Sequence, residues 1–195
     1  MKILALRIRN LTSLAGEISI DFEAEPLAHA GLFAITGPTG AGKSTLLDAL
    51  CLALYDEMPR LPSGADVRSA LRHGTGEGFA EVEFRGRDGG RYCASWKVRR
   101  ARNKPNGALQ AQELSLTDLS SGTVIAGRKR ETLHAIQEKV GLDYQQFRRS
   151  VLLAQNDFDA FLRAKPDERA SLLELMTGTR IYGAISKATY DSSKE

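Results

Sequence analysis

The residues best suited to chemistry lie between positions 37 and 44 and read Gly37-Pro38-Thr39-Gly40-Ala41-Gly42-Lys43-Ser44. This is a complete G-x-x-x-x-G-K-[ST] pattern, in which the glycines let backbone N–H groups turn inward around a phosphate. In such a loop the lysine reaches the β- and γ-phosphates and the serine hydroxyl binds Mg²⁺. A helix that begins at the loop adds about half a positive charge at its N-terminus. The pattern predicts a nucleotide-phosphate site.

The segments on either side of the loop are of the kinds that such a site requires. Residues 32–36 form a short apolar run that predicts a buried strand, and residues 45–55 have the length and residue types of a helix. A chance match in an unstructured glycine-rich turn is the alternative. The order strand, glycine loop, helix favours the phosphate site over that alternative.

Two alternating runs near the N-terminus predict a pair of antiparallel strands. In the first run Leu4, Leu6 and Ile8 face one way while Arg7 and Arg9 face the other. The pattern returns at residues 18–22, and residues 59–78 then read mainly as loop. Further short alternating strands are predicted at residues 80–84, 92–98 and 114–116, with a weaker one at 124–125. The chain is therefore predicted to be an α/β protein that joins a parallel nucleotide-binding core to an antiparallel sheet.

The last third of the chain is predicted to be mostly helical. Asp143 followed by Gln146 is typical of a capped helix start. Residues 150–154 are apolar and predict a core strand that delivers Gln155 into a polar turn. Pro166 is placed to begin a helix that Gly178 can end. The i, i+4, i+7 spacing of Ile181, Ile185 and Ala188 is compatible with the beginning of a coiled coil but is too short to establish one.

Composition narrows the class of protein. A chain of 195 residues with 42% hydrophobic residues can bury a sizeable core in one domain, with or without an appendage. Cys51 and Cys93 form no metal-ligand spacing and suit a reducing cytosol. The start of the chain is too short and too soon charged for a signal peptide, and no stretch is long enough to span a bilayer. We therefore expect a cytoplasmic protein with no membrane association.

Basic residues are clustered although the net charge is only +3. The largest cluster consists of Lys97, Arg99, Arg100, Arg102 and Lys104, and shorter ones lie at residues 128–130 and 148–149. Such clusters suit contacts with DNA phosphates, and a solvated strand end explains them equally well. Strand alternation places Lys97 and Arg99 on one face and the apolar Trp96 and Val98 on the other.

The acidic half of a hydrolytic site is missing from the sequence. A nucleotide hydrolase of this kind needs an apolar strand that ends in Asp, often followed by Glu, to hold the metal shell and polarise water. Residues 151–154 form such a strand, but Gln155 stands where the acid should be. Residues 119–122 resemble the signature loop of transporter-type ATPases, but they are predicted to lie in a turn between strands rather than at the start of a helix. The chain is therefore predicted to hold half of a catalytic site.

Three stretches together resemble the N-terminal segment of the bacterial SbcC family, the SMC-like branch of the ABC ATPases. They are residues 1–11, residues 37–49, and residues 152–155 with 165–170 and 177–179. The resemblance covers nearly the whole chain. It implies a P-loop NTPase fold of the ABC-ATPase head type, with an N-terminal lobe at residues 1–165 and a helical segment at 166–195 that leads into a coiled coil. In this family the acidic motif, the signature loop and the switch histidine belong to a C-terminal half at the far end of a longer chain.

The resemblance also assigns roles to residues. ATP would be held by Gly37, Pro38, Thr39, Gly40, Ala41, Gly42, Lys43, Ser44 and Thr45. Ser44 and Gln155 would bind Mg²⁺, and Lys43 and Gln155 would be the catalytic residues. Two positions depart from the family. Thr12 stands near where several relatives carry a basic residue close to the nucleotide, and Asn156 replaces a glycine, although Asn tolerates a left-handed backbone.

The partners implied by the resemblance are the chain's own C-terminal ATPase half, a second head that dimerises with ATP, an SbcD-like nuclease subunit and double-stranded DNA. The implied activity is ATP hydrolysis in DNA repair. Together with the nuclease subunit, the ATPase would form an ATP-dependent double-stranded DNA exonuclease and hairpin endonuclease. The complex would be cytoplasmic and associated with the nucleoid. Two alternatives remain at this point. One is the nucleotide-binding domain of an ABC transporter, and the other is a P-loop small-molecule kinase.

Overall fold

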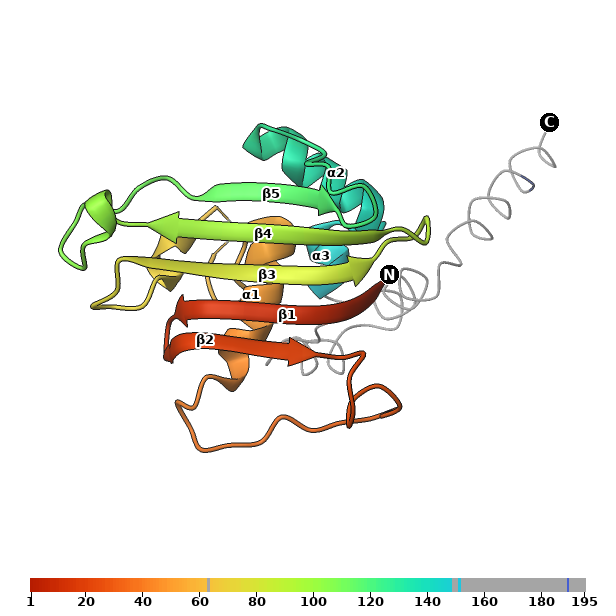
Figure 1. Ribbon diagram of the computed structural model, residues 1–195, viewed down its shortest axis with the longest axis horizontal. Coiled ribbons are helices and arrows are strands. Elements are labelled where there is room, and N and C mark those ends of the chain that lie inside the picture. The colour runs from red at the N-terminus through yellow and green to blue at the C-terminus, as the bar shows by residue number, and fades with distance from the viewer. Residues whose placement is uncertain (63, 149–150, 152–188, 190–195) are drawn as a thin grey trace. The chain divides into compact units, whose positions relative to one another are not determined.

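Five antiparallel strands form the sheet that organises the first 142 residues in the computed structural model (Figure 1). The structure describes residues 1–62, 64–148, 151 and 189. The order across the sheet is β2-β1-β3-β4-β5. The strands are β1 (Lys2–Leu11), β2 (Leu14–Asp21), β3 (Glu77–Arg85), β4 (Arg91–Arg99) and β5 (Glu113–Asp118).

Strand alternation builds the core. Ile20, Leu6, Val82, Ala94 and Leu116 are register partners from one strand to the next, so one apolar row crosses the whole sheet. All but Ile20 are at most 2% exposed. The predicted antiparallel pairing of the first two runs, and the strands predicted at 80–84, 92–98 and 114–116, are confirmed. Residues 124–125 add only an isolated bridge between Thr117 and Val124.

Two helices pack on this sheet, and Figure 1 shows α1 (Lys43–Tyr55) behind it and α2 (Lys129–Val140) along its β5 edge. Helix α1 contacts β1, β3 and β4, and helix α2 contacts β5 and α1. The second half of α1 is buried on all sides, which suits a helix with so many apolar residues. Short 3-10 helices, η1 (Val67–Ala70) and η2 (Ala101–Asn103), lie in the connections before β3 and after β4.

The strand predicted at residues 32–36 is wrong. These residues have no strand conformation and no backbone hydrogen bond among the described residues. Leu32 is 93% exposed, and Phe33 and Ile35 are about half exposed. A strand needs a neighbouring backbone to pair with, and every described sheet pairing is made among β1 to β5. The described sheet is wholly antiparallel, so the parallel core that we predicted is not found in the part of the chain that the structure describes.

The chain divides into the units Met1–Leu142 and Asp143–Glu195. In the second unit helix α3 (Tyr144–Phe147) begins as predicted, because the Asp143 side chain and the Gln146 side chain cap it reciprocally. Val151 has π-helical backbone and is 52% exposed, so the core strand predicted at 150–154 is wrong at that residue. The rest of that strand, Gln155, Asn156, the helix expected from Pro166 and the boundary at 165/166 lie outside the described residues. No helix in the described part is long and apolar enough to cross a membrane.

Candidate nucleotide-binding site

The N-terminus of α1 is open to an anion. Gly42 is its N-cap residue with φ 94°, no side chain caps the helix, and its first turn has no acidic residue. Among the described residues, the backbone N–H groups of Gly40, Gly42, Lys43 and Ser44 have no hydrogen-bond acceptor. Unpaired N–H groups and the helix dipole together form an anion site, and four donors within five residues match a phosphate.

Lys43 is held over the same loop. Its Nζ donates hydrogen bonds to the carbonyl oxygens of Gly37 (2.7 Å) and Pro38 (2.9 Å). An ammonium group has three donors, so this arrangement leaves one to reach a phosphate oxygen. The ammonium group is thereby held against the loop. That Lys43 contacts a phosphate remains a prediction.

Ser44 follows with an exposed side chain in the first turn of α1. The described residues contain no group of three or more His, Cys, Asp or Glu that could hold a metal ion. A magnesium ion here would therefore be held by Ser44 together with phosphate oxygens, which is the usual way Mg²⁺ is bound with nucleotides. The residues present fit that mode of binding.

The turn between β1 and β2 lies against the end of the loop. The hydroxyl oxygens of Thr12 and Thr45 are 2.6 Å apart. A Cβ atom added at Gly42 would lie 2.4 Å from Leu14 Cδ2 and 3.1 Å from Ser13 Oγ. Glycine is therefore needed at position 42 for two reasons: the backbone is left-handed, and there is no space for a Cβ atom beside Leu14. The Thr45 side chain, predicted among the ATP-binding residues, is 3% exposed and directed to Thr12.

Comparison with known proteins gives the loop a family context. Residues 5–188 match the family model described as an AAA domain. The chain belongs to this AAA domain family. It is 50% identical over 211 residues to the C subunit of the nuclease SbcCD from Pseudomonas aeruginosa, and 49% identical over 210 residues to the protein of the same name from Rhodobacter capsulatus. These matches confirm the resemblance to SbcC. Each covers 100% of this chain and 17% of the relative.

A solved structure supports the fold. A chain from work on ATP-driven dimerization and DNA-stimulated activation of SMC ATPases superposes with a TM-score of 0.59 at 18% sequence identity. The match covers 90% of this chain and 99% of that one. The predicted head-type P-loop fold and its antiparallel sheet with packed helices are confirmed, whereas the predicted parallel core is not found among the described residues and the predicted lead into a coiled coil lies outside them.

Within this AAA domain, Asp48 follows Ser44 by one helical turn and was not singled out by sequence reasoning. Its side chain is 4% exposed and forms an ion pair with Arg60 at 2.9 Å. Burial raises the pKa of Asp48, and the Arg60 guanidinium acts in the opposite direction. The sequence signal that could have identified Asp48 is an acidic residue inside the apolar run of α1, because a buried carboxylate requires a partner.

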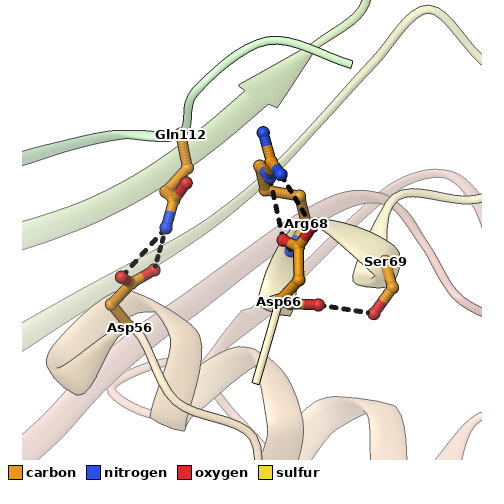
Figure 2. Close-up of polar contacts among 5 residues, drawn as sticks. All are labelled: Asp56, Asp66, Arg68, Ser69 and Gln112. Carbon is orange, nitrogen blue, oxygen red and sulfur yellow. Dashed lines mark hydrogen bonds and ion pairs between the residues drawn. The ribbon is translucent and has the colours of Figure 1, made fainter. Parts of the chain in front are cut away.

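At its other end α1 is closed by Asp56. This residue has left-handed backbone (φ 55°) and is 9% exposed. Trp96 Nε1 donates to its Oδ1 at 2.7 Å. Gln112 Nε2 lies 3.1 and 3.0 Å from its two oxygens (Figure 2). Lys129, at the start of α2, forms an ion pair with Oδ2. Asp56 therefore ties the nucleotide helix to β4, to the segment before β5 and to α2.

The basic cluster is partly paired with acids. Lys97 contacts Glu81 at 3.1 Å, and Arg99 contacts Glu113 at 3.6 Å. Trp96 and Val98 are buried on the opposite face of β4, as the alternation predicted. Arg102 and Lys104 are exposed and make no ion pair within the described part of the chain. The loop after β4 is therefore a better phosphate-contact candidate than the strand itself.

Proposed function

We propose that this chain is the ATP-binding half of an SbcC-like DNA-repair ATPase. The observation that carries the proposal is the open N-terminus of α1, where four unpaired backbone N–H groups and the Lys43 ammonium converge on one loop. The backbone donors would bind the β-phosphate, and Lys43 would contact the β- and γ-phosphates. Ser44 would hold Mg²⁺, which neutralises the charge that develops on the phosphate oxygens. Gln155, by family resemblance, would complete the metal shell.

Hydrolysis requires a second half of the site. The sequence has no apolar strand that ends in the required acidic pair, so this chain lacks the carboxylates that would activate water. Leu32, Phe33 and Ile35 expose apolar side chains just before the phosphate loop. Such surface on an otherwise well-packed protein supports a covering partner, which we propose is the C-terminal ATPase half. The chain spans 17% of the relatives that it matches, which leaves room for that half and for a coiled coil beginning within residues 166–195.

The names of the relatives support a proposal for the wider assembly. They are named as the C subunit of the nuclease SbcCD, which supports an SbcD-like nuclease partner for this chain. We propose that two heads dimerise around ATP and that the complex acts on double-stranded DNA ends or hairpins in the cytoplasm, on the nucleoid. Transporter and small-molecule kinase functions are disfavoured by the 50% identity to a nuclease subunit over the whole chain.

The test is steady-state ATPase activity of the isolated chain beside a mixture with the C-terminal half. The isolated chain should be nearly inert and prone to aggregate, and the mixture should dimerise with ATP and Mg²⁺ and hydrolyse ATP. Lys43→Ala should abolish turnover in the mixture because it removes the phosphate charge. Gln155→Ala should spare much of the ATP binding and reduce turnover. Substantial turnover by the isolated chain, lost in Lys43→Ala, would refute the split-site proposal, and phosphate transfer to a small acceptor would support a kinase instead.

A further inference from the structure

Arg72 holds the turn that lies against the phosphate loop. It belongs to the segment between η1 and β3, 60 residues after Thr12 in the sequence. Its Nη1 donates hydrogen bonds to the carbonyl oxygens of Thr12 (3.0 Å) and Ser13 (2.8 Å). One guanidinium nitrogen therefore binds two successive carbonyl groups of the β1–β2 turn.

The backbone around Arg72 reinforces this contact. The Arg72 N–H donates to Asn10 O at 2.9 Å, and the Thr12 N–H donates to Ala70 O at 2.8 Å. Thr12 has φ 45°, a left-handed conformation that is unfavourable for a β-branched residue. The turn does not adopt this conformation by intrinsic preference. It is held there by contacts with residues 70–72.

The same turn touches the nucleotide site on its other side. The Thr12 hydroxyl meets the Thr45 hydroxyl, and Ser13 and Leu14 fill the space beside Gly42. Gly42 and Thr45 flank Lys43 and Ser44, the two residues expected to act on phosphate and metal. A shift of the turn would therefore be transmitted to the loop through packed contacts rather than through solvent.

We propose that Arg72 is a positioning residue of the nucleotide site, acting through the Thr12–Ser13 turn on Gly42 and Thr45. The inference rests on the proposed function, because it concerns ATP affinity at the same loop. Arg72 makes no ion pair with a carboxylate in the described part of the chain, so its guanidinium is not balanced by a local acid. Its hydrogen bonds to the turn are the contacts that the structure assigns to it.

The test uses the full ATPase head, assembled with its C-terminal half, and measures Mg·ATP affinity by calorimetry. Arg72→Met should weaken binding about tenfold, because it removes a charge-assisted contact from the turn. Arg72→Lys should restore most of the affinity, since an ammonium can donate to both carbonyls. Arg68→Met is the matched control, because within the described part of the chain the Arg68 side chain is bound to Asp66 in its own short turn (Figure 2). It should bind ATP as the wild type does.

A double-substitution cycle with Thr12→Val separates positioning from general destabilisation. Thr12→Val removes the hydroxyl contact with Thr45 and leaves the contacts of Arg72 with the turn carbonyls in place. If Arg72 acts through this turn, the double variant should lose little more affinity than the weaker-binding single variant. Additive losses, unchanged affinity in Arg72→Met, or no rescue by Arg72→Lys would each overturn the inference. If Arg72→Met does not fold, Arg72→Gln, which keeps a side-chain N–H donor but no charge, takes its place in the cycle. Lys43→Ala, measured in parallel, shows separately whether the loop binds ATP at all.

Discussion

The two ends of α1 use the same backbone chemistry in opposite ways. At the N-terminal end Gly42 has no side chain, and the adjacent N–H groups have no acceptor among the described residues. At the C-terminal end Asp56 is buried and receives hydrogen bonds from Trp96 and Gln112 and an ion pair from Lys129. A carboxylate at the C-terminus of a helix opposes the helix dipole, so it needs these donors. One end is left for an external anion, and the other is satisfied within the protein.

This difference shows how the fold prepares a binding site. Unpaired donors in an exposed or half-exposed loop can remain, because water can satisfy them at little cost to folding. The helix that carries them must still be held in place. Asp56 supplies that anchor at a distance of about 20 Å along the helix, from 13 residues at about 1.5 Å each. Rigid support behind an open site limits the reorganisation needed when a ligand binds.

The largest effect should come from breaking the closed end. Asp56→Ala leaves the buried Trp96 N–H without its acceptor and should cost about 3 kcal/mol of unfolding free energy. Trp96 is the only tryptophan, so urea unfolding followed by its fluorescence reports on this contact directly. Asp56→Asn, which keeps the acceptor oxygen, should lose clearly less. Wild-type stability in Asp56→Ala would show that the anchor has no energetic role.

At the open end Gly42→Ala should cost about 2 kcal/mol, expressed mainly as weaker Mg·ATP binding. An alanine at φ 94° is strained, and its Cβ would collide with Leu14. Gly40→Ala is the matched control, because Gly40 also has positive φ (83°) but nothing within 4 Å of an added Cβ. It should show only the conformational part of the cost. Equal Mg·ATP affinities for the two variants, measured by calorimetry, would mean that the contact with the β1–β2 turn does not affect nucleotide binding.

Asp88 is an exposed carboxylate that, like the buried Asp56, accepts hydrogen bonds from other side chains, and we expect a smaller effect from it. Lys139 Nζ and the Tyr92 hydroxyl both donate to Asp88 at 2.8 Å, which lowers the pKa of Asp88 from 3.8 to about 2. Because the pKa is lower in the folded state, this carboxylate stabilises the protein above about pH 4 and loses that contribution as the pH falls toward 2. Asp88→Asn should flatten the dependence of stability on pH in that window. If the unfolding free energy depends on pH equally in Asp88→Asn and the wild type, Asp88 does not contribute to acid stability.

The smallest effect is expected from the basic cluster, where paired and unpaired charges can again be compared. Replacing Lys97, Arg99 and Arg102 together should weaken DNA binding equally across sequences and flatten its salt dependence, by about one unit of slope for each side chain that binds a phosphate. Since Lys97 and Arg99 are already paired with Glu81 and Glu113, Arg102→Ala alone should reproduce most of the change. An unaltered salt slope in filter-binding or fluorescence titrations would leave the cluster as a solvated surface.

Much of the fold was predictable because its signals are local. The alternation of Leu4, Leu6 and Ile8 specifies one buried face of a strand, and the capping pair Asp143 and Gln146 specifies a helix start within four residues. The apolar run at 32–36 was misread for a reason that is also physical. Hydrophobicity shows that a segment favours burial, but burial and strand pairing need a partner, and no described strand provides one.

The candidate phosphate loop could be proposed from the sequence alone, because its glycines, Lys43 and the helix start lie within a few residues and need only local backbone geometry. Three of the contacts that support it were decided by the tertiary structure: Asp56 with Trp96, Arg72 with Thr12, and Thr45 with Thr12 join residues 40, 60 and 33 positions apart. No spacing rule links such pairs, since their approach depends on how β1, β4 and α1 pack together. Local patterns can specify a site, while the contacts that hold it in place exist only once distant segments of the chain have packed.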